Sequence, residues 1–243
     1  MPLADCLCPI PSPWLDIGKT LVGVFAGAFL AFCANLYLQH LQRQRSNLAA
    51  GNMALAILSR QYGDFVIFRA GLRRELDEMP SFAGWLQIKP TVFALSDSLR
   101  IDFPSLTFLF EHERHDLLGK LVLAETKYHD LRNILEKNTV ACEERDQALA
   151  EAGMVNFSVE DLRRAENAVN SALRAKCDSL NQFLQQRAER DVLVYRAAGQ
   201  ALHSMMAKTF GTTKVMPFTA MGAQEEYVDA DWKIKEINQA SGS

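Results

Sequence analysis

The fold that we predict is decided by one uninterrupted apolar stretch, Thr20–Gln39, which reads TLVGVFAGAFLAFCANLYLQ. Its twenty residues include no Asp, Glu, Lys or Arg. As an α-helix the stretch is about 30 Å long, which matches the hydrocarbon thickness of a bilayer. We therefore predict a single transmembrane helix over residues 14–39.

The residues at both ends of this stretch favour a position across a membrane. Trp14 precedes it and Tyr37 lies near its far end, and aromatic side chains of this kind prefer the headgroup region. Arg43 and Arg45 follow it, whereas the residues before it include two acids and a single lysine. Because basic residues are enriched on the cytoplasmic side, we predict a cell inner membrane protein with residues 1–13 as a short extracytoplasmic tail and the C-terminal part in the cytoplasm.

Small residues inside the stretch predict self-association. Gly23 and Gly27 form a G-x-x-x-G pair, and Ala31 extends the same stripe by one turn. Such a stripe lets two helices approach closely in lipid, where packing drives association. We predict a homo-oligomer on this basis, although glycine and alanine are common enough in membrane spans for the spacing to arise by chance.

A cleaved signal is the competing interpretation of the same stretch. Residues 30–33, Leu-Ala-Phe-Cys, resemble the cleavage box of a bacterial lipoprotein signal. Phe32, however, is bulky where that class of site carries a small residue, and the first basic residue is Lys19. The apolar stretch also continues beyond Cys33, as a membrane span does.

The overall composition excludes several classes of protein. The chain has 243 residues, of which 49% are apolar, so it is long and apolar enough to form a packed core. Its net charge of −3 argues against a nucleic-acid partner. Five cysteines are too few for a disulfide scaffold in a chain of this length.

Beyond the apolar stretch, three long amphipathic patterns predict an all-α fold. Large apolar residues recur every seven positions at Leu41, Leu48, Leu55, Tyr62 and Leu76, with an interruption at Arg69. Such a heptad-like seam is typical of coiled coils and bundle helices. The predicted helices cover residues 40–79, 103–150 and 159–210, with an irregular tail over 211–243. Short connections favour antiparallel neighbours. We therefore predict a cytoplasmic antiparallel bundle, residues 40–210, in which Arg43 lies level with about residue 140.

This arrangement predicts that two irregular segments, residues 80–102 and 211–243, meet at the end of the bundle farthest from the membrane. Both are rich in large apolar side chains, which indicates either a second small core or a surface that binds a protein partner. The side chains that we single out as this candidate surface are Phe82, Trp85, Phe93, Phe218 and Trp232.

Sequence motifs give little support for catalysis. His112 and His115 are spaced to share one helical face, with His129 farther along the same predicted helix, so a metal-dependent enzyme is a minor hypothesis. The E-x-x-H and H-E-x-x-H patterns of metal-binding helices are absent from the sequence. We predict no catalytic residue, no cofactor and no metal site.

These features together predict a single-pass membrane protein whose helical domain acts as a scaffold or sensor. It would contact membrane lipid through the span and a protein partner, unknown from the sequence, through the bundle. The alternative is a membrane effector that oligomerises through its span and perturbs the bilayer.

Overall fold

The computed structural model describes residues 13–78, 84–89, 98–111, 114–154 and 161–220. The chain divides into two units, residues 1–47 and 48–243, and each is described by itself. The described residues form helices joined by irregular segments, and no strand occurs among them. The predicted all-helical class is therefore confirmed.

The longest helix, α1 (Pro13–Glu78), begins in the first unit and ends in the second. It ends just before Met79 and Pro80, because proline cannot continue a helix and disfavours helical geometry in the residue before it. In the second unit one seam of α1 faces the core. The sequence predicts this seam, and it is confirmed at Leu55, Leu58, Tyr62, Phe65 and Leu72, all of which are buried.

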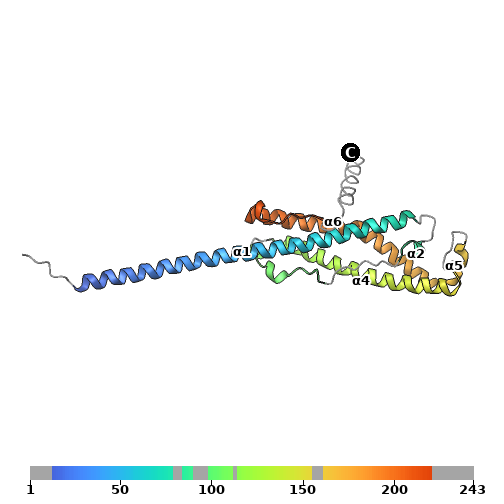
Figure 1. Ribbon diagram of the computed structural model, residues 1–243, viewed down its shortest axis with the longest axis horizontal. Coiled ribbons are helices and arrows are strands. Elements are labelled where there is room, and N and C mark those ends of the chain that lie inside the picture. The colour runs from blue at the N-terminus through green and yellow to red at the C-terminus, as the bar shows by residue number, and fades with distance from the viewer. Residues whose placement is uncertain (1–12, 79–83, 90–97, 112–113, 155–160, 221–243) are drawn as a thin grey trace, which may run out of the picture. The chain divides into compact units, whose positions relative to one another are not determined.

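Two further long helices, α4 (His115–Glu151) and α6 (Ser171–Phe210), lie beside the second-unit part of α1 (Figure 1). The centre of the core joins all three. The ring of Phe65 on α1 lies 4.7 Å from the ring of Tyr195 on α6, measured between centroids. The hydroxyl of Tyr195 donates a hydrogen bond to the backbone carbonyl of Ala124 on α4.

The directions of the helices differ from the prediction. Gln61 of α1 donates to Glu125 of α4, and three residues later Asp64 accepts from Tyr128, so the two helices run in the same direction. Helix α6 runs antiparallel to α4, as the ion pairs Lys127–Asp191 and Lys176–Glu144 show, and it is also antiparallel to α1. An antiparallel sequence of three helices predicts that the second helix opposes the first and that the third runs in the same direction as the first. Both predictions are wrong, although the antiparallel pairing of α4 and α6 is found.

The reason lies in the segment between α1 and α4, which runs back along the bundle. The first element that the structure describes in this segment is the short helix α2 (Gly84–Gln87). It lies beside the C-terminal half of α4, where the Arg145 guanidinium donates to the carbonyls of Trp85 and Ile88 at 2.9 and 3.1 Å. Farther along, the Leu99 carbonyl accepts from Gln61 in the middle of α1. The segment then enters the helical turns η1 (Phe103–Leu106) and α3 (Phe108–Glu111).

Two predicted helix boundaries are corrected. The helix predicted to start at residue 103 starts at His115, because Arg114 has a non-helical backbone. The helix predicted over residues 159–210 is divided into α5 (Leu162–Ala168) and α6, with Val169 and Asn170 in extended conformations. Asn170 caps α6, since its side-chain oxygen accepts a hydrogen bond of 2.7 Å from the Leu173 amide.

Residues 211–220, the described part of the predicted irregular tail, pack on the bundle. Gly211 ends α6 with a φ of 90°, and the turn η3 (Thr212–Lys214) follows. The amide of Met216 then donates to the side chain of Asn52, and the ring of Phe218 stacks on that of Tyr62 with centroids 5.5 Å apart. Phe218 also lies against Gly199, where a Cβ atom would overlap the ring.

The Arg145 contacts generate a prediction about stability. Arg145→Met keeps the apolar stem but leaves the Trp85 carbonyl without its donor and the Ile88 carbonyl with only the weak Cys142 thiol, so we expect the free energy of unfolding to fall by about 2–4 kcal/mol. Chemical unfolding of the full-length protein in detergent, followed by circular dichroism, measures the change. The matched control is Arg190→Met at an exposed position of α6, which we expect to cost less than about 0.5 kcal/mol. Equal losses in the two variants contradict the role given to Arg145.

Candidate functional site

The first candidate site is the apolar part of α1 in the first unit. Every residue from Thr20 to His40 is exposed. The large apolar side chains of this part are between 49% and 72% exposed, and they are Leu21, Val22, Val24, Phe25, Phe29, Leu30, Phe32, Leu36, Tyr37 and Leu38. By length and composition this is a helix that can cross a membrane.

The apolar side chains point in every direction around the helix axis. Successive residues of an α-helix are rotated by about 100°, so Val24, Phe25 and Leu30 point to three different sides of the axis. A single partner helix covers one stripe only. Fully burying a side chain of this size is worth about 1.5–3 kcal/mol. The arrangement therefore matches an apolar solvent on all sides, as lipid provides.

The predicted packing stripe is open in the first unit. At Gly23 and Gly27 an added Cβ would meet no atom within 4 Å, and Ala31 is exposed. Of the predicted membrane anchors, Tyr37 is 64% exposed, and Arg43 and Arg45 are also exposed. The side chain of Trp14 lies outside the described residues.

The candidate partner surface at the far end of the bundle does not form as one surface among the described residues. Trp85 is only 3% exposed and packs in a small core with Leu149 and Cys177. Phe218 packs in the other, larger core against Tyr62. The Trp85 carbonyl contacts Arg145 in the C-terminal half of α4, whereas Phe218 stacks on Tyr62, whose neighbour Gln61 contacts Glu125, twenty residues before Arg145. Trp85 and Phe218 therefore lie far apart along the bundle. Phe82, Phe93 and Trp232 lie outside the described residues.

The histidines named in the sequence do not converge. His115 lies beside Phe110, with ring centroids 5.7 Å apart, whereas the His129 ring contacts Glu125 at 3.2 Å. His112 lies outside the described residues. Within the described ranges, no group of three His, Cys, Asp or Glu side chains has the geometry to hold a metal ion.

The two bundle cysteines are buried and shielded from reaction. The Cys142 thiol faces the Ile88 carbonyl and the Cys177 thiol faces the Ala141 carbonyl. Burial raises the pKa of Cys142 to about 11 and also raises the pKa of Cys177, partly offset in both by the charge of Arg145. Both groups are therefore thiols at neutral pH, and a thiol is a weak nucleophile.

Acidic side chains in the core have structural partners. Asp64 accepts from the Tyr128 hydroxyl at 2.9 Å and pairs with Arg60 at 3.3 Å. Burial raises the pKa of Asp64, although the Tyr128 hydrogen bond and the Arg60 charge act in the opposite direction. Glu125 accepts from Gln61, and Asp191 is held by the cations on either side of it. These contacts fix the register of α4 against its neighbours.

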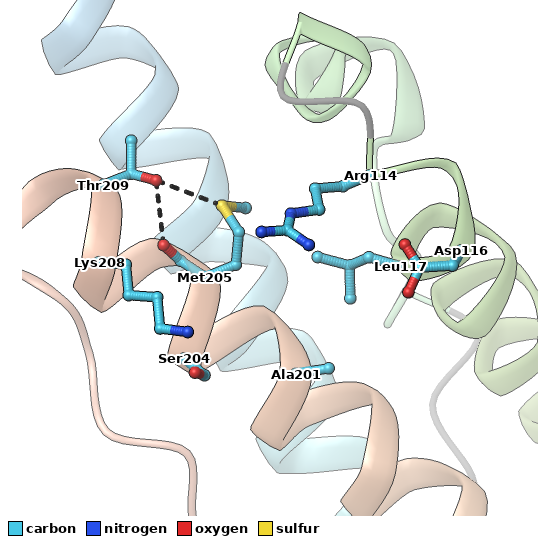
Figure 2. A pocket seen from close by; sticks show the side chains of 8 residues that line it. All are labelled: Arg114, Asp116, Leu117, Ala201, Ser204, Met205, Lys208 and Thr209. Atoms are coloured by element: carbon cyan, nitrogen blue, oxygen red, sulfur yellow. Dashed lines mark hydrogen bonds between the residues drawn. The ribbon is translucent and has the colours of Figure 1, made fainter.

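A second candidate site is a pocket of about 270 Å³ between the first turn of α4 and the last turns of α6 (Figure 2). We call it the basic pocket. Its apolar wall is formed by Leu117, Ala201 and Met205, and its polar groups come from Arg114, Asp116, Ser204, Lys208 and Thr209. Local sequence motifs do not reveal this pocket, because its two cations lie far apart in the sequence.

Comparison with known proteins gives no family for this chain. No family model, curated protein or solved structure matches it. The function is therefore argued from the residues of the chain itself.

The buried carboxyl of Asp64 generates a prediction about pH. A raised pKa means that the folded state favours the protonated acid, so its stabilising effect is lost as the pH rises through the folded-state pKa. Asp64→Asn keeps an acceptor for Tyr128 and has no charge to desolvate. We therefore expect the variant to gain stability relative to the wild type as the pH rises from about 4 to 7.

Unfolding curves of both proteins across this pH range measure the difference. Asp102→Asn, at an exposed position, is the control and should leave the pH dependence as in the wild type. If the difference in unfolding free energy between Asp64→Asn and the wild type does not change with pH, the role given to the Asp64 carboxyl is wrong.

Proposed function

We propose that this protein is a membrane-anchored helical scaffold or sensor that acts through protein–protein contacts. The observation that carries the proposal is α1, whose apolar part is exposed on all sides and whose later part forms the core of a helical bundle. One helix thus belongs to both a candidate membrane span and a folded domain. We propose no catalytic role, since the buried acids and thiols described above serve the packing of the bundle.

The orientation is part of the same proposal. Arg43 and Arg45 follow the apolar part directly and are exposed. Basic residues in such a position favour the cytoplasmic side of a membrane. We place the bundle in the cytoplasm and the short N-terminal tail across the cell inner membrane.

The partner surface is sought among exposed apolar side chains of the bundle. Val140 on α4 is 50% exposed and Leu193 on α6 is 45% exposed. Apolar side chains that remain in water are common singly, so position alone does not identify the surface. They are suitable sites for crosslinking because substitution there leaves the core intact.

The scaffold proposal predicts capture of one dominant partner. A photo-crosslinking amino acid at Val140 or Leu193 of the full-length protein, activated in native membranes, should capture one cytoplasmic protein of different sequence, identified by mass spectrometry. Leu193→Glu should reduce capture from Val140 if both face the partner. A control crosslinker at Ala31, inside the span, should not capture that partner. Capture of an extracytoplasmic protein overturns the orientation, and self-crosslinks alone overturn the scaffold.

The alternative function is a membrane effector whose spans associate through the small-residue stripe. The open surface at Gly23 and Gly27 favours it, because a second helix can approach there closely. Gly23→Ile with Gly27→Ile should then weaken self-association by about tenfold and remove any growth defect on overexpression. Ala26→Ile with Ala28→Ile adds bulk to other sides of the helix and is the control. Unchanged self-association and an unchanged growth defect in the glycine variant rule out the effector.

A further inference from the structure

The basic pocket contains two cations that have no acidic partner among the described residues. Arg114 and Lys208 line it from opposite helices, and their side chains reach toward the space between α4 and α6 (Figure 2). Other cations of the bundle, such as Arg187 and Lys176, are engaged in ion pairs. Both side chains are exposed. Within the described ranges no acid pairs with either of them, so together they leave a positive charge that an anion would neutralise.

The remaining lining groups fit a small oxyanion. Ser204 contributes a hydroxyl group, which can donate a hydrogen bond to a phosphate oxygen. The Thr209 hydroxyl is already used, since it donates to the Met205 carbonyl at 3.0 Å. Asp116 also lines the pocket and carries the opposite charge, but its carboxylate lies 3.9 Å from Lys120. The lining is therefore net positive. The volume of about 270 Å³ is just below the range of about 300–1,000 Å³ for drug-sized ligands, so a small group fits best.

The N-terminus of α4 adds to the positive electrostatic potential of the pocket. Arg114 is the residue that precedes the first turn of α4, and no side chain forms a cap hydrogen bond there. A helix of this length carries a partial positive charge at its N-terminus, which favours anions near its first turn. The inference depends on the cavity and on the two cations that line it. The partial charge at the N-terminus of α4 has the same sign as these cations and also favours an anion.

The pocket lies at the end of the bundle that is close in the sequence to the candidate span. Met206, next to the pocket residue Met205, packs against Gly51, and the Asn52 side chain donates to the Lys214 carbonyl. Gly51 follows Gln39, the last residue of the apolar stretch, by only twelve residues. Twelve residues span at most about 43 Å, which limits how far Gly51 can lie from the end of the apolar stretch.

We propose that the basic pocket binds a phosphate group, with Arg114 and Lys208 as the charged donors. The headgroup of an anionic phospholipid is the source that its position favours, and a free phosphate is the other source of the same chemistry. The lipid source rests on the proposed membrane anchoring, whereas phosphate binding in the pocket does not.

The first experiment tests the pocket in the full-length protein in detergent. Inorganic phosphate is titrated at constant ionic strength against chloride, and thermal unfolding reports binding. Phosphate should stabilise the wild type, and Arg114→Gln with Lys208→Gln should weaken the apparent affinity by about tenfold or more. Asp116→Asn should strengthen it, because it removes the one acid in the lining. The matched control, Lys137→Gln with Arg190→Gln, removes two exposed cations elsewhere and should bind as the wild type does.

The second experiment separates the two sources. The same proteins are reconstituted into vesicles of phosphatidylcholine with or without phosphatidic acid, and native mass spectrometry counts the retained phosphatidic acid. If the wild type and the control retain phosphatidic acid and the pocket variant retains about tenfold less, the source of the phosphate is the lipid headgroup. A response to inorganic phosphate without lipid retention identifies a free phosphate.

The phosphate site and the membrane anchoring are two separate hypotheses, and different results contradict each of them. If the pocket variant matches the wild type in both experiments, the phosphate site is overturned while membrane anchoring stands. If the wild type does not insert into vesicles of phosphatidylcholine alone, the anchoring is overturned, and the phosphate titration in detergent still decides the pocket.

Discussion

The path of the chain between α1 and α4 depends on the buried guanidinium of Arg145. Burying such a charge costs several kcal/mol unless hydrogen bonds satisfy it. Here the carbonyls of Trp85 and Ile88 accept from it, and Asp146 lies 2.8 Å from it at the edge of the core. Backbone carbonyls buried outside a regular helix need donors just as the guanidinium needs acceptors. Each therefore removes the desolvation cost of the other.

The direction of α4 relative to α1 agrees with this contact. With α2 held beside the C-terminal half of α4, the chain must return along the bundle before α4 can begin. Helix α4 then runs in the same direction as α1, and the short turn region around α5 sends α6 back against both. The final segment starts where α6 ends, beside Gly51, and packs on α1 from there.

Sequence patterning predicted the elements of this fold better than their arrangement. The apolar stretch and the seam through Leu55 and Phe65 are local, periodic signals, and both the helix and the buried side of the seam are found where they indicate. The direction of α4 is not predictable in this way. A connection of this length can either reverse the chain at one end of the bundle, which gives an antiparallel helix, or run back along the bundle, which gives a parallel one. A signal is present in α4 itself, where Arg145 interrupts an otherwise apolar seam and is buried. Buried polar side chains at core positions indicate a fixed partner, in this case the returning segment for Arg145.

The basic pocket differs from these elements because its residues are brought together only by the antiparallel pairing of α4 and α6. A ligand in the pocket would contact the turn of α6 that contains Met205 and Met206. Met205 lines the pocket, and its carbonyl accepts a hydrogen bond from Thr209, while the neighbouring Met206 packs on Gly51. A ligand shifts a conformational equilibrium only through a difference in affinity between two states. A phosphate held between Arg114 and Lys208 would bridge the start of α4 and the last turns of α6, beside the turn that packs on α1. The role that we propose for the pocket is therefore to hold α4 and α6 together where the bundle meets a phosphate-bearing surface.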